Sequence, residues 1–475
     1  MAYTYGTLSA FSGVRTDLSQ ALMSTDMSPD ACNMDTRSGD LKTATGFSSV
    51  TREALPTEDR LLRLYLYPVE LGMRMLAVTS HALYSYIGAR REWRAVYTFN
   101  TWLTPARIDF TPVRLGSEDR LLIAYGDGQA LLYDAVTHEV TPFGSAEKLS
   151  DVPISYAALH FGRLFASGNM LEPSRLYWSK APGDDRAIDD WRADPASENV
   201  SGGFVDVGIG DDPITGLFPM SNQLLIFTRD NLYRLLGDRP SNFRVVKVDT
   251  AVQPPQHTAC VRYADRLYFL TADGLFCYDG QTVRRPASAS APAALLQTAN
   301  LQDIASAACG DRLYFLFRSE NGEALDTMLE YDVLRDRFMV RRGFLLRDLS
   351  VASGWLCALS DAGRVVRFDG SPDYDGDPIE AWWDTPLLDF GHKEADKTLL
   401  SMTATGAGTL AVTVESNGAR YETQAVLDEH PLSVTEIPLC MVGRVFRLRF
   451  SNVNGQPLRL DAKPTLLLDL QRRPV

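Results

Sequence analysis

Cysteine and histidine are scarce in this sequence, and neither is clustered. Its 475 residues include six of each. The sequence contains no Cys-x-x-Cys and no His-x-x-x-His pair, and such pairs supply the ligands of most structural zinc sites. Free cysteine packs as a small apolar residue, so we expect reduced thiols in a chain that folds in the cytoplasm. The cysteines are Cys32, Cys260, Cys277, Cys309, Cys357 and Cys440.

Long apolar runs and runs of basic residues are also missing. The sequence has no stretch of about 18 uninterrupted apolar residues, so we expect no membrane span. The opening MAYTYGTLSAF lacks the charged and apolar regions of a secretory signal, and we expect none. With 47 basic and 60 acidic residues, the net charge is −13. This balance disfavours a protein that grips DNA through its phosphates, so we expect no specific DNA binding.

Common catalytic motifs are missing too. The sequence contains neither a Gly-x-Ser-x-Gly elbow nor a phosphate-binding loop. DYDGDPIE (373–380) places Asp373, Asp375 and Asp377 at alternating positions, but the twelfth position holds Asp384 where an EF-hand needs glutamate. We therefore favour a hinge here over a cation site. We predict a protein without catalytic residues or cofactor.

The sequence does contain a repeat. A Leu-rich strand, a polar turn and a second strand ending near Tyr/Phe-Asp recur seven times, a pattern typical of β-hairpins. Most copies begin about 43–46 residues apart, which is the period of four-stranded propeller blades. The copies begin at Met73, Asp119, Gly162, Asn222, Asp265, Asp311 and Gly354.

This repeat predicts an all-β fold with a β-propeller over residues 58–372. Seven blades are expected, and six are the alternative because the first and last copies are the least regular. A β-sandwich with accidental spacing is the other interpretation. After residue 372 the pattern changes to alternating strands around Asn417-Gly418 and Asn454-Gly455, which are two hairpin signals. We predict a small antiparallel β-sandwich over residues 373–475.

Three other features are candidates for contacts with other molecules. Residues 1–57 are polar and weakly patterned; we expect an ordered arm that reaches a neighbouring subunit, or else a strand that closes the last blade. An acidic insertion (181–208) carries Trp191, a residue type common at interfaces, although a loop tryptophan often caps its own domain. A basic row in the C-terminal domain either contacts an acidic neighbour or is a solvated strand face. The row is Arg444, Arg447 and Arg449.

Three segments resemble parts of tailed-bacteriophage structural proteins built on a propeller. Near the start, Asn33-Met34, Gly39-Asp40-Leu41 and Gly46-Phe47 are similar to an arm of the packaged-DNA-stabilisation, or tail-hub, proteins of short-tailed phages. The run from Leu176 to Leu235 and the run from Trp383 to Lys397 resemble later parts of such proteins. The resemblance covers most of the chain.

The resemblance implies a virion protein of the head-to-tail region, made in the cytoplasm of a bacterial host. It implies a six-fold homo-oligomeric ring that closes the DNA channel below the portal and contacts portal or adaptor proteins and distal tail proteins. Asn33, Met34 and Phe47 are the candidate contact residues in its arm. The alternatives are a receptor- or glycan-binding propeller at the tail tip and, third, a propeller enzyme acting on polysaccharide.

Overall fold

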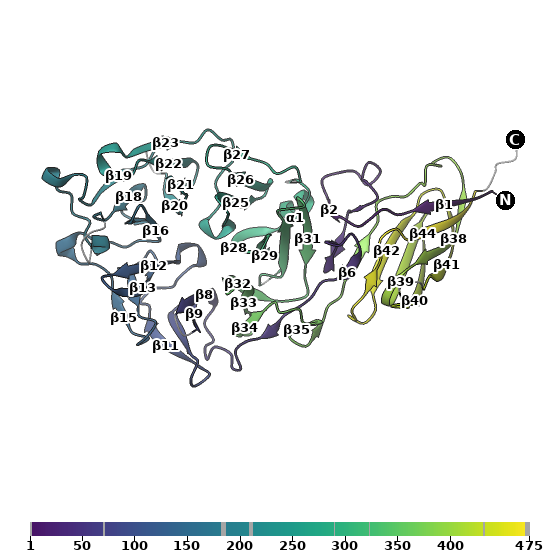
Figure 1. Cartoon of the computed structure of the whole chain (residues 1–475), viewed down its shortest axis with the longest axis horizontal. Coiled ribbons are helices and arrows are strands. Elements are labelled where there is room, and N and C mark those ends of the chain that lie inside the picture. The colour runs from purple at the N-terminus through teal and green to yellow at the C-terminus, as the bar shows by residue number, and fades with distance from the viewer. Residues whose placement is uncertain are drawn as a thin grey trace.

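The structure, a computed structural model, is an elongated molecule with a ring of small sheets at one end and two stacked sheets at the other (Figure 1). The first and last strands, β1 (Ala2–Thr7) and β44 (Thr465–Leu470), pair antiparallel in the stacked sheets. Both termini therefore lie at the same end of the molecule. The residues described are 2–69, 72–181, 187–208, 212–288, 290–322, 324–430 and 433–470.

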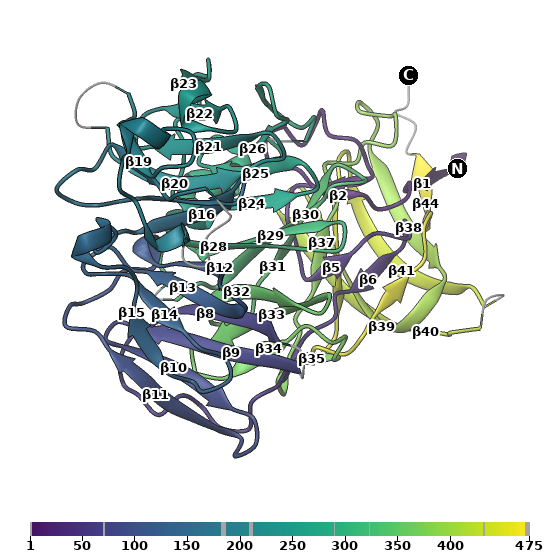
Figure 2. The same cartoon turned by 60° about the vertical axis from the view of Figure 1, so that its left-hand side comes forward.

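Seven sheets of the described residues are arranged around an axis, which confirms the predicted propeller and its blade number (Figure 1 and Figure 2). Each blade is antiparallel, and its two middle strands are one copy of the sequence repeat. The first four blades are β8 (Leu61–Val69), β9 (Gly72–Thr79), β10 (Ala82–Ile87) and β11 (Glu92–Thr98); β12 (Asp109–Leu115), β13 (Glu118–Ala124), β14 (Leu131–Tyr133) and β15 (Val140–Pro142); β16 (Tyr156–His160), β17 (Arg163–Ser167), β18 (Arg175–Trp178) and β19 (Gly203–Asp206); and β20 (Ile214–Pro219), β21 (Gln223–Thr228), β22 (Leu232–Leu236) and β23 (Arg244–Lys247).

The last three blades follow the same order, but two of them also take strands from the N-terminal segment. The sixth blade is extended by β2 (Gly13–Val14) and β3 (Met27–Ser28) into a six-stranded sheet. The strands from the repeats are β24 (Cys260–Tyr263), β25 (Arg266–Thr271), β26 (Gly274–Tyr278) and β27 (Val283–Arg284); β28 (Asn300–Cys309), β29 (Arg312–Arg318), β30 (Thr327–Asp332) and β31 (Arg337–Arg341); and β32 (Leu346–Ala352), β33 (Trp355–Ser360) and β34 (Val365–Arg367).

Apolar contacts between successive blades form most of the core. Leu76 and Leu121 lie in one cluster between the first two blades, and the Phe227 and Phe269 rings meet edge-to-face at 5.5 Å between the fourth and fifth. Strand β21 is buried at all its positions because a blade covers each of its faces. This explains why the middle strands read as nearly continuous apolar runs rather than alternating ones.

Polar side chains on the innermost strands join neighbouring blades. The carboxylate of Asp348 in β32 accepts a hydrogen bond from the backbone N–H of Leu64 in β8 (2.7 Å). Asp109 in β12 accepts one from the N–H of Ala157 in β16 (3.1 Å). The hydroxyl of Ser306 in β28 donates to the carbonyl oxygen of Cys260 in β24 (2.9 Å). These bonds satisfy backbone groups that strands of separate sheets would otherwise leave unpaired.

The propeller is closed by the N-terminal segment. The seventh blade takes its outer strand, β7 (Ser48–Ser49), from the start of the chain, with Val366 opposite Ser49 and Arg367 opposite Ser48. This arrangement is the alternative that the sequence left open for the segment. It joins the first and last parts of the propeller across more than 300 residues, so the ring cannot open without breaking this pairing.

The sandwich also contains N-terminal strands, so residues 1–57 are built into both parts of the subunit. One sheet has the order β1-β44-β38-β41, and the other the order β4-β37-β42-β39-β43-β6-β5, with β40 paired to β39. The bounds are β4 (Ala31–Cys32), β5 (Met34–Asp35), β6 (Leu41–Thr43), β37 (Trp382–Asp384), β38 (Lys397–Ala404), β39 (Gly406–Ser416), β40 (Ala419–Leu427), β41 (Thr435–Gly443), β42 (Arg447–Asn452) and β43 (Arg459–Leu460).

Of the two predicted Asn-Gly hairpins, one is confirmed and one is wrong. Asn417 and Gly418 both have positive φ and connect β39 to its partner β40. Asn454 and Gly455 also have positive φ, but the following strand β43 pairs with β39 and β6 instead of β42. Pro457 follows this turn and has no N–H to donate, which opposes an immediate return along β42.

Short elements complete the fold. The hairpin β35 (Asp373–Tyr374) and β36 (Asp377–Pro378) links the propeller to the sandwich. No helix within the described ranges is long and apolar enough to span a membrane. The helical turns are α1 (Ala293–Thr298), η1 (Pro105–Arg107), η2 (Ala146–Lys148), η3 (Ala187–Asp189), η4 (Pro195–Ser197), η5 (Pro240–Asn242) and η6 (His257–Ala259).

Candidate functional site

Asn33 lies at the joint between the propeller and the sandwich. It is 2% exposed, and its φ of 53° is in the left-handed region that asparagine tolerates better than most residues. Its Nδ2 donates to the carbonyl oxygens of Arg342 (2.9 Å) and Glu380 (2.8 Å). Its Oδ1 accepts from the N–H of Arg342 and the hydroxyl of Tyr374 (both 3.0 Å). The amide is therefore satisfied within the subunit.

The other two predicted arm residues are also buried in the subunit. Met34 is 2% exposed and belongs to a core that runs from the fifth and sixth blades into the sandwich. Phe47 is 4% exposed, and its ring lies 5.0 Å from Tyr374 and 5.1 Å from Phe368. All three side chains thus hold the subunit together, and none of them presents a surface to a neighbouring molecule.

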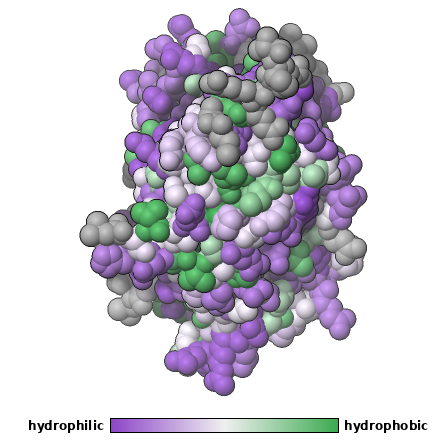
Figure 3. All heavy atoms as spheres, turned by 90° about the vertical axis from the view of Figure 1, so that its right-hand side faces the viewer, coloured by the Kyte–Doolittle hydropathy of each residue, from purple (hydrophilic) through white to green (hydrophobic). Residues whose placement is uncertain are grey.

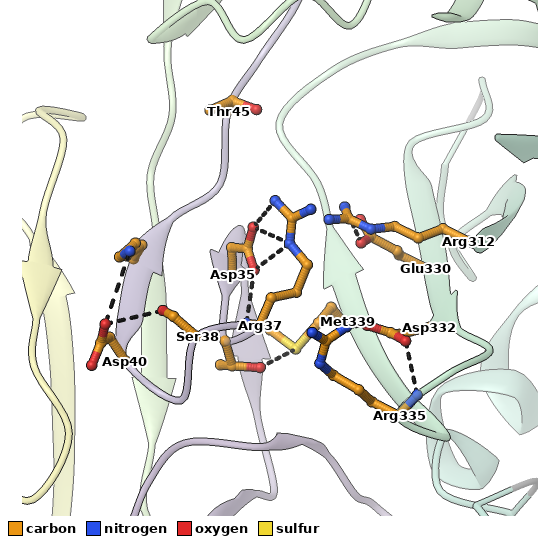
Figure 4. A network of polar contacts seen from close by, with 12 residues as sticks. Asp35, Arg37, Ser38, Asp40, Thr45, Arg312, Glu330, Asp332, Arg335 and Met339 are labelled. Carbon is orange, nitrogen blue, oxygen red and sulfur yellow. Dashed lines mark hydrogen bonds and ion pairs between the residues drawn. The ribbon is translucent and has the colours of Figure 1, made fainter. Parts of the chain in front are cut away.

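A network of charges, buried on the side of the sixth blade, lies where the N-terminal segment meets that blade. Figure 4 shows Asp35 and Arg37 of the segment beside Glu330 and Arg312 of the blade. Glu330 contacts Arg312 at 2.5 Å and Arg341 at 2.9 Å, and these three side chains are at most 9% exposed. Arg341 also donates from Nη1 to the carbonyl oxygen of Thr45 in the segment (2.9 Å).

The energetics of this network depend on its pairing. Burial raises the pKa of the Glu330 carboxyl, and its contact with the Arg341 guanidinium opposes that shift. The Arg37 guanidinium donates to Asp35 and holds the pKa of that carboxyl below its usual value despite burial. A buried charge that loses its partner costs several kcal/mol. The network therefore makes docking of the segment sensitive to single changes.

Trp191 packs on its own domain. It is 3% exposed, stacks on Tyr177 with 5.4 Å between ring centroids, and donates from Nε1 to the carbonyl oxygen of Ile188 (3.1 Å). Neighbouring Asp190 pairs with Arg192 and Lys180, which hold the pKa of its carboxyl well below the usual range. Residues 182–186 of the predicted acidic insertion lie outside the described residues.

The predicted basic row pairs with groups of its own chain. Arg444 contacts Asp396 at 2.7 Å. Arg447 donates to Gln20 (2.6 Å), and Arg449 contacts Asp384 at 2.5 Å. Arg447 and Arg449 lie on β42 and their outer sides are partly exposed, as the alternative of a solvated strand face proposed. Arg444 lies in the turn before that strand.

The three aspartates of the predicted hinge lie in the β35–β36 hairpin. Asp373 accepts from the N–H of Gly376 (3.0 Å), and Asp375 accepts from the N–H (2.9 Å) and hydroxyl (2.5 Å) of Ser49. Asp377 is exposed on β36. The carboxylates of Asp373 and Asp375 thus hold the turn and the closing strand. Among the described residues, no cluster of three or more histidine, cysteine or acidic side chains could hold a metal ion.

The hollows on the propeller include a groove at the last two blades and the central channel. A groove of about 850 Å³ runs beside the last two blades, where Asp361 pairs with Arg347 (2.5 Å) and the hydroxyl of Ser319 donates to Asp326 (2.5 Å). The central channel, about 520 Å³, is lined by the innermost strands and by His257. Burial lowers the pKa of His257 to about 3, so its ring is neutral at neutral pH. The polar side chains named in both hollows thus contact other groups of the same chain.

Two features of the joint and the sandwich were missed by reasoning from sequence. Glu330 follows the apolar pair Met328-Leu329 in TMLEYD, a strand that is buried at every position, and a charged residue in a buried strand signals a buried partner. Tyr3 and Tyr5 alternate with smaller residues in the first strand and are 59% and 72% exposed. That alternation is the signal of a strand with one outward face.

Comparisons with known proteins add little to this geometry. No protein-family model matches the sequence, and no curated protein shows significant sequence similarity to it. Among solved structures, the AfRom2 CNH domain is similar at a TM-score of 0.42 and 9% identity, over 68% of this chain and 99% of that domain.

Proposed function

We propose that the protein is a non-enzymatic structural component of a tailed-phage particle, assembled as a ring in the head-to-tail region. In this role it closes the DNA channel below the portal and attaches tail components. The resemblance of three segments to the tail-hub proteins of short-tailed phages supports this position in the particle. The observation that carries the proposal is the construction of the joint, where residues 2–49 tie the propeller and the sandwich into one body.

Rigidity is the property that a connector subunit needs, and the joint supplies it. The buried amide of Asn33 and the Glu330 network hold the two parts at two separate places, and β7 anchors the same N-terminal segment in the seventh blade. One hydrophobic core continues from the blades into the sandwich. A subunit of this kind transmits force between neighbours instead of bending at a linker.

The charge and the hollows are compatible with a DNA channel made by several subunits. The net charge of −13 opposes tight contact with phosphates, so DNA can move past the ring. The propeller's own channel is about 520 Å³ and is lined by side chains of the innermost strands. DNA would therefore pass through the centre of the subunit ring and outside each propeller.

The proposal is tested by producing phage particles that lack this protein. Virus carrying a stop codon early in this gene is grown with and without a plasmid that supplies the protein, and the heads are assayed for nuclease-sensitive DNA. We expect heads that package DNA but release it, with tails missing, and rescue by the plasmid. Normal filled heads with complete tails that fail only to adsorb would instead support the tail-tip alternative and overturn the proposal.

A further inference from the structure

The outer face of the sheet β1-β44-β38-β41 is unlike the rest of the sandwich surface. It points away from the propeller, at the end shown in Figure 3, where pale and green side chains lie in the middle and hydrophilic ones at the margins. Its exposed members include Tyr5 (72%) and Val442 (52%), together with Pro438 and Cys440. The charged residues that point outward from these four strands are Glu436 and Asp469.

The other sheet of the same sandwich provides the comparison. Its outer face carries ion pairs across neighbouring strands, Arg447 with Glu415 (3.8 Å) and Arg449 with Asp384 (2.5 Å). It also carries the pair of Arg420 with Glu422 along β40. That composition is typical of a strand face in contact with water. Interfaces between proteins are instead enriched in tyrosine and depleted in charged residues at their centre. The first face has the composition of an interface.

The size of the face is near that needed for a stable pair. Four strands spaced about 4.8 Å apart, with six to nine residues each at about 3.3 Å, cover roughly 19 Å by 25 Å. The side chains make the accessible area larger than this flat area of about 500 Å². It therefore approaches the roughly 800 Å² that each partner buries in a standard interface.

The composition also indicates which partner fits. A chain with a net charge of −13 is repelled by a second copy unless the contact is made through a face with few charges. Flat sheet faces pack best on other sheet faces, about 10 Å apart. The blades cover each other's faces, and the second sandwich sheet carries ion pairs. Within the described part of this chain, the matching sheet face with few charges is therefore the same face of another copy.

We propose that this face docks the same face of a second copy, forming a two-fold dimer of the free protein. The contact is isologous and cannot by itself close a ring, so the ring contacts of the proposed function lie elsewhere. The inference thus goes beyond that function, and the two fail in different measurements: the dimer in the mass of the purified protein, and the ring role in particles.

The experiment compares two exposed valines of the same domain. Val442 lies on the proposed face, whereas Val426, 73% exposed, lies on the outer side of β40 in the other sheet. The full chain, Val442→Glu, Tyr5→Glu and Val426→Glu are purified, and their masses are followed by sedimentation over about 0.1–50 µM. Circular dichroism melts verify that each variant is folded.

We expect the unaltered chain and Val426→Glu to reach twice the monomer mass of 52.6 kDa. Val442→Glu and Tyr5→Glu should associate at least about 100-fold more weakly, because each places like charges opposite one another in the contact. Maleimide labelling of Cys440, the exposed cysteine of this face, should slow as the dimer forms. The Cys440→Ser variant lacks this thiol, so the labelling that it loses is the labelling of Cys440.

Three results would overturn the proposal. The first is an unaltered chain that stays monomeric at 50 µM. The second is that Val442→Glu and Tyr5→Glu, each folded, both dimerise as tightly as the unaltered chain. The third is Cys440 labelling that slows only when other virion proteins are added, which would assign the face to a different partner.

Discussion

Replacing Phe47 with alanine should open the last blade of the propeller. Phe47 directly precedes the closing strand β7, and its buried ring packs on Phe344, Phe368 and Tyr374 at 5.0 to 6.2 Å. The truncation leaves a cavity next to a strand that holds the ring closed with two residue pairs. The seventh blade should therefore lose its outer strand more readily than any other blade.

The expected size follows from burial. A phenylalanine truncated to alanine in a packed core typically costs about 3–5 kcal/mol, and Phe47 is 4% exposed. Because β7 has little pairing of its own, most of this loss should appear as a lower free energy of opening for β33 and β34. Leu22→Ala is the matched control, since Leu22 lies in the same N-terminal segment but is 80% exposed. We expect it to change stability by less than about 0.5 kcal/mol.

Native-state hydrogen exchange measures this directly. Amides of β33 and β34 report the seventh blade, and amides of β17 report the third blade as an internal reference. The prediction is a fall of about 3 kcal/mol or more in the opening free energy of the seventh blade in Phe47→Ala. A fall below about 1 kcal/mol there would refute the claim that the N-terminal segment closes the ring.

Three further predictions concern buried polar groups. Glu330→Gln leaves Arg312 and Arg341 without a buried counter-charge, so the free energy of unfolding in urea should fall by about 3–5 kcal/mol; Glu118→Gln, at a side chain that is 63% exposed, should change it by less than about 0.5 kcal/mol, and equal effects would contradict the network. Asn33→Ala removes the hydrogen bonds of the Asn33 side-chain amide and places alanine at positive φ. The free energy of unfolding in the same titration should fall by about 2–4 kcal/mol, and a fall below about 1 kcal/mol would contradict a structural role. Because burial lowers the pKa of His257 to about 3 while an unfolded histidine titrates near 6.5, the unfolded chain binds the extra proton between these values, and stability falls as the pH drops below about 6.5. Between pH 8 and pH 5 this histidine should lower the free energy of unfolding by about 2 kcal/mol. Urea titrations at the two pH values should therefore show a fall that is smaller by about this amount in His257→Gln than in the unaltered chain. An equal fall in both proteins would show that His257 is not the cause.

The propeller could be predicted because its signal is local and repeated. Each middle hairpin, such as Arg266–Tyr278, carries its own turn and its own apolar strands, and most of the seven copies follow at the same spacing. The outer strands were not predictable to the same degree. Those of the fifth and seventh blades, β27 and β7, have two residues each, too few to show an alternation.

The joint shows why the contact residues were assigned to the wrong kind of surface. Asn33, Met34 and Phe47 stand in a polar segment, and a pattern of two or three residues per strand does not reveal burial. The side chains of Asn33 and Phe47 contact residues about 300 positions or more away, such as Arg342 and Tyr374. Long-range pairing of this kind is decided by the tertiary fold and leaves no local period in the sequence.

Trp191 and the basic row were ambiguous for a different reason. A loop tryptophan can cap its own domain or anchor a partner, and an arginine row can be solvated or bound, with the same sequence pattern. The structure places Trp191 over Tyr177, and it places Asp384 beside Arg449. The partner in each case is supplied by a separate element, which the sequence alone does not position.

The most direct test of the account is a cryomicroscopy reconstruction of intact particles of the tailed phage that the proposal assigns to this chain. The account predicts a closed ring of copies between portal and tail, with the propeller, joint and sandwich of each subunit fitting the density as one rigid body. A particle that lacks the protein, or that carries it at the tail tip with propeller and sandwich in separate orientations, would contradict it.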